Sequence, residues 1–135
     1  MISMMKGKYT EKLRTGGDLT VTASSWSIEY YFSGPDLRYR GDFVTVKGTQ
    51  IDQYISAWAN NFGKYLELKK FMPVNGTFTT TGEMNMTSNV GGYSEGVCLR
   101  SYHMPVKSEE KMMDIIEDYE YAKKQAALMM KILQG

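Results

Sequence analysis

Apolar and polar positions alternate with period two over residues 18–32, the pattern of a strand with one buried face. The glycine pair at 16–17 precedes this run, and residues 3–14 before it are expected to form a short N-terminal helix or an extension. We expect a strand over residues 18–24 whose alternation continues to residue 32. Four large apolar residues share one face of the continuation: Trp26, Ile28, Tyr30 and Phe32.

A turn is indicated at residues 33–36, where Ser, Gly, Pro and Asp follow one another. Residues 37–46 then resume a strand pattern and are expected to return as the partner strand, with a bulge near Gly41. The two runs together predict a β-hairpin.

The apolar period changes to that of a helix after Thr49, which lies three residues before Asp52 in a spacing that resembles a capping box. The apolar positions at helical spacing are Ile51, Tyr54, Ile55, Trp58 and Phe62. Asn-Asn-Phe-Gly at 60–63 offers a residue that tolerates the left-handed conformation of a helix end. We therefore expect the helix to end at Gly63, although the pattern also allows it to run on through Tyr65 and Leu66.

A three-strand meander is predicted after this helix. The strands are expected at residues 64–72, 77–87 and 93–104, joined by turns at 73–76 and 88–92.

A long C-terminal helix is predicted over residues 107–134, with Ser108 as its N-cap and two glutamates in its first turn. Apolar residues alternate at spacings of three and four along it: Met112, Ile115, Tyr119, Ala122, Ala126, Met129 and Leu133. Such a stripe either covers the protein's own sheet or forms a seam with a partner helix. The small side chains of Ala122 and Ala126 would allow close approach in either case.

These elements predict a single α+β domain over residues 1–135, with an N-terminal extension or short helix at 1–16. The expected order is β-β-α-β-β-β-α. The expected architecture is two-layered, with an antiparallel sheet of about five strands and helices packed on one side. A length of 135 residues is typical of one domain.

Charge and composition remove several function classes. Sixteen basic and fifteen acidic residues give a net charge of +1, which makes nucleic acid an improbable partner. No apolar run is long enough for a membrane span or a signal peptide, so no membrane association is expected. One cysteine permits no internal disulfide, and a cytoplasmic location fits best.

The residues for nucleophilic or metal chemistry are scarce, because the chain has one cysteine, Cys98, and one histidine, His103. A separation of five places them on opposite faces of a regular strand. Two such residues are also too few for a zinc site. No phosphate-binding glycine motif occurs, so we predict no catalytic residues, no metal and no cofactor, and lean against an enzyme.

Ten tyrosines and eleven methionines favour adaptable contact surfaces, so the leading hypothesis is a non-enzymatic binding or assembly module. It would act through a Tyr-rich sheet face and the apolar stripe of the last helix, as a homodimer or with a protein partner. The alternative is a small-ligand-binding protein or an enzyme with a cavity between the sheet and the last helix. Its candidate ligand-binding residues are Trp26, Tyr30, Trp58, Tyr93 and His103. A third reading is a small viral or mobile-element protein that binds a host factor.

Overall fold

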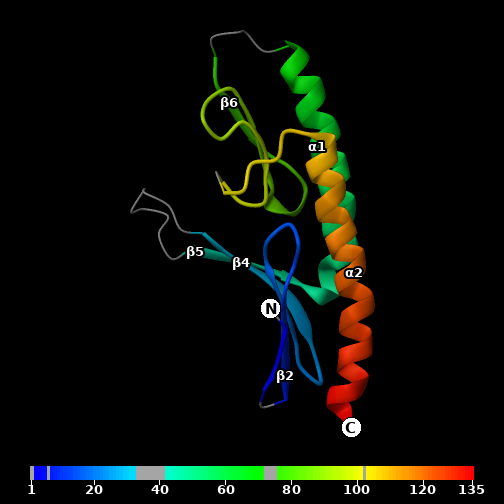
Figure 1. Ribbon diagram of the computed structural model, residues 1–135. Helices are drawn as coiled ribbons and strands as arrows, with labels where there is room; N and C mark the ends of the chain where they lie inside the picture. The colour runs from blue at the N-terminus through cyan, green and yellow to red at the C-terminus, as the bar shows by residue number, and fades with distance from the viewer. Residues whose placement is uncertain (1, 6, 33–41, 72–75, 102) are drawn as a thin grey trace. The chain divides into compact units, whose positions relative to one another are not determined.

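The computed structural model describes residues 2–5, 7–32, 42–71, 76–101 and 103–135 (Figure 1). The chain divides into two compact units, which are described separately. Unit 1 consists of Met1–Ile51 and Glu117–Gly135, and unit 2 is Asp52–Ile116. The expected single domain over 1–135 stays a prediction.

Unit 1 is built on an antiparallel sheet whose five strands are neighbours in chain order. The strands are β1 (Ile2–Met5), β2 (Lys8–Lys12), β3 (Asp18–Val21), β4 (Trp26–Phe32) and β5 (Asp42–Lys47). A short 3-10 helix, η2 (Gly48–Gln50), follows β5. The unit is completed by the second part of the long helix α2 (Glu109–Gln134).

The alternating apolar residues of unit 1 form the buried face of the sheet. Leu19 pairs with Ile28, Ile28 pairs with Val46, and all three are fully buried. Directly paired residues of an antiparallel sheet lie on the same face. The period-two pattern of the sequence is therefore the pattern of this core.

The second part of α2 packs against the core face of the sheet. Tyr119, Ala122 and Ala126 are fully buried, and the Tyr30 hydroxyl donates to the Tyr119 hydroxyl at 3.1 Å. Near the end of the helix, the Gln134 amide donates to the Ala23 carbonyl at 2.9 Å. Small residues at 122 and 126 let the helix backbone lie close to the sheet.

Unit 2 combines the helix α1 (Ile51–Phe71, from Asp52 on) and the start of α2 with a second antiparallel sheet, in the order β6-β7-β8. The strands are β6 (Phe78–Thr81), β7 (Thr87–Val90) and β8 (Gly96–Cys98), with the 3-10 turn η3 (Glu83–Asn85) before β7. Every residue of β7 is buried, although three of the four are polar.

Buried polar contacts fix the loops of unit 2. The Asn61 side chain on α1 donates to the Glu83 carbonyl and accepts from the Glu83 N–H, both at 3.0 Å. The Asn89 side chain donates to the carbonyls of Ser94 and Ser101 at 3.1 and 3.3 Å. Side-chain amides thus replace the backbone ladder where the strands end.

The α+β class, the antiparallel pairing and the strand-helix order from β4 onward are confirmed. The cap of the last helix is present, since the Lys111 N–H donates to the Ser108 hydroxyl at 3.2 Å. The structure differs from the expectation in that its strands form two sheets and three strands precede β4.

Of the two alternatives expected for residues 3–14, a short helix or an extension, the helix is wrong. This segment forms β1 and β2, because Gly7 takes a positive φ of 71° between them and turns the chain back. Tyr9 is buried against the core, and a further turn at 22–25 divides the run from 18 to 32 into β3 and β4. The predicted turn at 33–36 and the bulge near Gly41 lie outside the described residues.

The predicted helix end at Gly63 is also wrong, and with it the strand over 64–72. The helix continues to Phe71, since Gly63 does not take a left-handed conformation and Tyr65 extends the buried face as a fully buried residue. The competing helical pattern through Tyr65 and Leu66 is the one that the chain follows.

The other two meander strands are shorter than predicted. The run at 77–87 is broken by η3, where Met84 and Asn85 take positive φ values, and β7 occupies the start of the predicted turn at 88–92. Only 96–98 of the predicted 93–104 run is a strand. Most of the predicted 73–76 turn lies outside the described residues.

Candidate functional site

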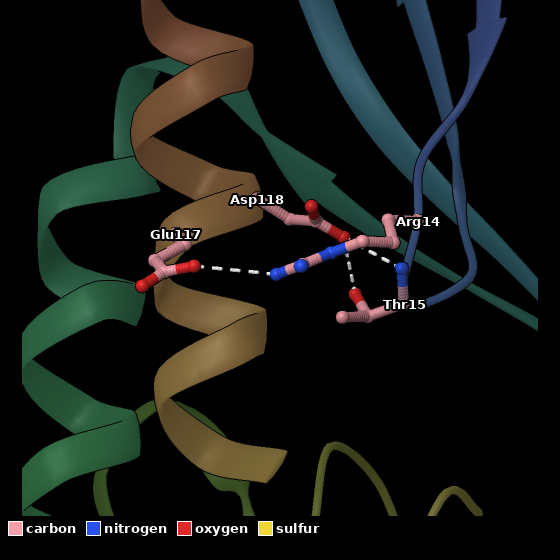
Figure 2. A network of polar contacts seen from close by, with 4 residues as sticks. All are labelled: Arg14, Thr15, Glu117 and Asp118. Atoms are coloured by element: carbon pink, nitrogen blue, oxygen red, sulfur yellow. Dashed lines mark hydrogen bonds and ion pairs between the residues drawn. The ribbon is translucent and has the colours of Figure 1, made fainter. Parts of the chain in front are cut away.

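The loop between β2 and β3 is joined to α2 by a small polar network (Figure 2). Asp118 is buried, and its carboxylate accepts from the Thr15 N–H at 2.8 Å and also from the Thr15 hydroxyl. Beside it, the exposed Arg14 guanidinium donates to Glu117 at 3.2 Å. The buried carboxylate is thereby paired, and the loop is fixed to the helix.

A second network lies on β2 around the Glu11 carboxylate. The hydroxyls of Tyr9 and Tyr121 donate to its two oxygens, each at 2.5 Å, and the Gln125 amide donates to the Tyr9 hydroxyl at 3.0 Å. The hydrogen bond to Glu11 raises the pKa of Tyr121 to about 12. Tyr121 is thus held as a neutral donor at neutral pH.

These two networks border an open cleft of about 520 Å³ in unit 1. Its lining residues are Glu11, Lys12, Leu13, Arg14, Glu117, Asp118 and Tyr121. All three carboxylates of the cleft accept hydrogen bonds from this chain. The arrangement holds loop, strand and helix together, which is a positioning role for these carboxylates.

Next to the cleft, unit 1 exposes apolar side chains along one side of its sheet. Ile2 and Met4 of β1 are 64% and 51% exposed, although they pair with Glu11 and Tyr9 and so lie on the core face. On α2, Leu128 lies seven residues after Tyr121 and Ile132 four residues after Leu128, so these three side chains lie along one line of the helix. We call the five residues, each 42–64% exposed, the open edge: Ile2, Met4, Tyr121, Leu128 and Ile132.

The open edge arises because the sheet is wider than its helical cover. Tyr121 and Gln125 contact residues of β2, and β1 lies one strand farther out. Together these five half-exposed side chains present on the order of 500 Å² of surface, comparable with the largest apolar patch on a typical single chain. Exposed apolar area of this size is often functional.

The opposite, outer face of the sheet carries polar residues such as Thr20 and Glu29, and it also exposes an aromatic pair. Tyr31 and Phe43 are 63% and 58% exposed, with ring centroids 6.1 Å apart. A shallow groove of about 400 Å³ reaches Tyr31 from β2 and β3 and is lined mainly by lysine, threonine and acidic residues. The Tyr31 hydroxyl donates to Glu29 at 2.5 Å, so this polar group is also paired.

The five predicted ligand-binding residues fall into both units and differ in exposure. In unit 1, Trp26 is half-buried and Tyr30 is buried. In unit 2, Trp58 is fully buried, Tyr93 is fully exposed and His103 is half-buried. The ligand role of these residues stays a prediction.

The predicted interface stripe on α2 is largely internal. Met112 is 6% exposed, while Ile115, Tyr119, Ala122 and Ala126 are fully buried, and only Met129 and Leu133 are half-buried. This chain therefore uses most of the stripe for its own core. The exposed apolar line of the helix is the neighbouring one, through Leu128 and Ile132.

Cys98 has the environment of a core residue. It is fully buried in β8, and burial raises the pKa of its thiol to about 12, so the thiol is protonated at neutral pH. His103 lies in an isolated β-bridge, where its backbone N–H donates to the Arg100 carbonyl at 3.0 Å. Among the described residues, no cluster of three or more His, Cys, Asp or Glu side chains is placed to bind a metal ion.

Comparison with known proteins gives no family for this chain: no family model, no curated protein and no solved structure matches it. Within the described part of the chain, no helix is long and apolar enough to cross a membrane.

Sequence reasoning missed the open edge because it treated residues 3–14 as a helix or extension. One signal was available. Ile2 and Met4 are two residues apart, and after the Gly7 turn Tyr9 lies between the polar residues Lys8 and Thr10, which is strand spacing. On α2, Leu128 and Ile132 lie outside the predicted apolar stripe. The contacts of α2 with β2 show which line of the helix lies toward the edge strand.

Proposed function

We propose that this chain is a non-enzymatic binding or assembly module, and that the open edge of unit 1 is its contact surface. The observation that carries the proposal is the exposure of Ile2 and Met4 on the core-facing side of a strand that the helix does not cover. Binding of a partner to apolar surface in this position is favourable, because it removes that surface from water.

The polar networks beside the open edge support binding rather than catalysis. The carboxylates of Glu11, Glu117 and Asp118 accept hydrogen bonds from neighbouring side chains or backbone, which suits a rigid rim around a contact surface. The proposed location is the cytoplasm, because the single cysteine of the chain allows no internal disulfide.

The test compares capture of partners by three forms of the full chain: wild type, Leu128→Glu and Phe43→Lys. Leu128 lies in the open edge, whereas Phe43 is similarly exposed on the opposite face of the sheet and serves as the matched control. We expect Leu128→Glu to lose the bound proteins, including a differently tagged copy of the chain, and Phe43→Lys to retain them. Equal capture by all three forms would refute the open edge as the contact surface.

A second candidate function is binding of a small polar ligand in the 520 Å³ cleft, with or without catalysis. It is favoured by the size of the cleft and by the exposed Arg14 guanidinium at its rim. Titration with inorganic phosphate and with succinate, followed by NMR shifts of Lys12, Arg14 and Tyr121, tests it. Saturable shifts that disappear in Arg14→Ala support this function, and unchanged spectra with both probes argue against an anion site.

A further inference from the structure

The first strand of unit 1 has the properties of a strand that is open to pairing. β1 is at the end of the sheet order, and no strand of the described chain pairs with its outer side. An edge strand turns alternate N–H and C=O groups outward, where they are available to another strand. β1 consists of Ile, Ser, Met and Met, whereas the opposite edge, β5, begins with Asp42 and ends with Lys47. Charged residues discourage pairing at an edge, and β1 has none.

The exposed apolar side chains of the open edge come from both a strand and a helix, so a partner that covers all of them needs a strand layer and a helix layer. Met4 and Ile2 need apolar contacts on the core face, and Leu128 and Ile132 need apolar contacts from the helix side. A single added strand covers only the first pair. A partner that brings both a strand and an adjoining helix covers both pairs, and unit 1 itself has this construction.

We infer that the partner at the open edge is a second copy of this chain, joined by antiparallel pairing of the two β1 strands about a two-fold axis. This inference rests on the proposed function and names its partner. An isologous contact of this kind uses the same surface on both copies, which is the commonest arrangement in homodimers.

The two-fold pairing has a definite register. Residues opposite one another in an antiparallel pair share a face, so Ile2 of each copy must stand opposite a residue of the core face of the other. The register that sets Ile2 opposite Met4 also sets Ser3 opposite Ser3. It brings the exposed apolar residues of the two copies together and continues the core face across the junction.

Size and charge are compatible with this dimer. Each open edge presents on the order of 500 Å² of apolar surface, so complete burial in two copies would remove about 1,000 Å², the lower bound for a specific interface, before backbone contacts are added. The net charge of each copy is only +1, so electrostatic repulsion between the copies is weak.

Sedimentation of the full chain over a range of concentrations tests the inference. We expect a monomer-dimer equilibrium whose dissociation constant rises at least about tenfold in Met4→Lys and in Leu128→Glu, which place a charge in the contact. Phe43→Lys should leave the constant unchanged. Circular dichroism establishes that each variant is folded, and the 51–58% exposure of the three positions makes folding of the variants the expected result.

A cysteine at position 3 tests the register. Under mild oxidation, Ser3→Cys should form a covalent dimer, because position 3 of one copy stands opposite position 3 of the other. The native Cys98 is fully buried and does not compete. Adding Met4→Lys should slow the cross-linking at least about tenfold.

Two outcomes overturn the inference: a monomer at every concentration, or a dimer whose dissociation constant is insensitive to both Met4→Lys and Leu128→Glu. A monomer that still loses captured proteins on Leu128→Glu would remove the second copy as partner and keep the open edge as a binding surface. Capture that is insensitive to Leu128→Glu would remove the proposed function itself.

Discussion

The two units of this chain reach order by different means. Unit 1 has a sheet with apolar residues on one face, and its core contains fully buried aliphatic residues such as Leu19, Val21 and Val46. Unit 2 has a shorter sheet whose central strand buries Thr87, Ser88 and Asn89. Burying polar groups costs free energy unless they are hydrogen-bonded, so unit 2 relies on specific side-chain contacts in addition to the apolar residues that it buries, such as Trp58, Tyr65 and Val106.

The difference indicates which unit has apolar surface available for binding. In unit 1, the apolar residues of the core face continue onto the edge strand β1, where α2 does not cover them and Ile2 and Met4 are exposed. In unit 2, hydrogen bonds of Asn61, Asn89 and Glu95 fix the loops, although the buried Oδ1 atom of Asn89 accepts no hydrogen bond from the described residues. The binding proposal therefore concerns unit 1, and the stability predictions separate the two ways of making a core.

The largest effect is expected from a charge in the apolar core of unit 1. Ala126 is fully buried on α2, so Ala126→Glu places a carboxylate where no water reaches it and should destabilise the fold by about 3 kcal/mol or more. Leu128→Glu, two residues away and 53% exposed, should change the free energy of unfolding by less than about 0.5 kcal/mol. Urea unfolding measures both.

If both substitutions prove equally mild, the helix does not bury the face that contains Ala126. If both are equally severe, Leu128 belongs to the core and the open edge is not a surface. The pair thus tests the assignment of the two neighbouring lines of α2.

The next effect concerns unit 2 and uses two adjacent asparagines with one partner. Asn61 is 1% exposed and bonds both backbone groups of Glu83, whereas the exposed Asn60 reaches only the Glu83 carboxylate, at 3.2 Å. Asn61→Ala leaves those two backbone groups without their side-chain partner and should cost about 2 kcal/mol. Asn60→Ala should cost less than about 0.5 kcal/mol.

Denaturant unfolding and amide exchange at Glu83 measure this contrast. Exchange at the Glu83 N–H should be faster in Asn61→Ala and unaltered in Asn60→Ala. A mild effect of Asn61→Ala, with protection at Glu83 retained, would mean that apolar burial and not the amide contact orders unit 2.

The same contrast explains how much of the fold the sequence predicts. The hairpin of β4 and β5 and the last helix were predicted, because burial in unit 1 follows the periods of the strand and the helix. The break at η3 was not, since it depends on Asn61 contacting residue 83 across 22 positions of sequence. The end of α1 was predicted wrongly because Gly63 was taken as the glycine that ends a helix. The helical spacing of Tyr65, which is fully buried, was the better signal.

The candidate site was harder to predict than the fold. The sequence showed the seven-residue apolar stripe on α2 from Met112 to Leu133. Whether this stripe faces a core or a partner depends on the sheet beside it. Once β1 and β2 form a hairpin, the line through Leu128 and Ile132 becomes the exposed one. No local pattern distinguishes the two lines, because both are apolar at helical spacing.

A smaller effect is expected from the Glu95 carboxylate in unit 2. It accepts from the Tyr65 hydroxyl at 2.8 Å, from Lys69 at 3.2 Å and from the Gly91 N–H at 3.1 Å, and these contacts, the Tyr65 bond first, lower its pKa. A carboxyl whose pKa is lower in the folded state stabilises the fold above its unfolded pKa of about 4.3. That stability is lost as the pH falls through the folded value.

Glu95→Gln should therefore lose about 1 kcal/mol near neutral pH and little once the pH lies below the folded pKa of the carboxyl. Tyr65→Phe keeps the carboxyl, removes its main donor and should raise the pKa of Glu95 toward the ordinary value in an NMR titration. An unchanged Glu95 titration in Tyr65→Phe would show that the hydroxyl is not the contact that matters.

The last prediction concerns the chemical reactivity of Cys98. Its thiol is fully buried in β8 with a pKa raised to about 12 by burial, and the Asn89 amide lies 3.5 Å from the sulfur. Only the thiolate reacts with disulfide reagents, so native protein should react at least about 100-fold more slowly than protein in denaturing urea. Asn61→Ala weakens the same unit without touching the sulfur and should speed the reaction through more frequent opening of unit 2, whereas Leu128→Glu on the surface of unit 1 should not. Equal acceleration by both would mean that the two units open together, and that they unfold as one cooperative structure.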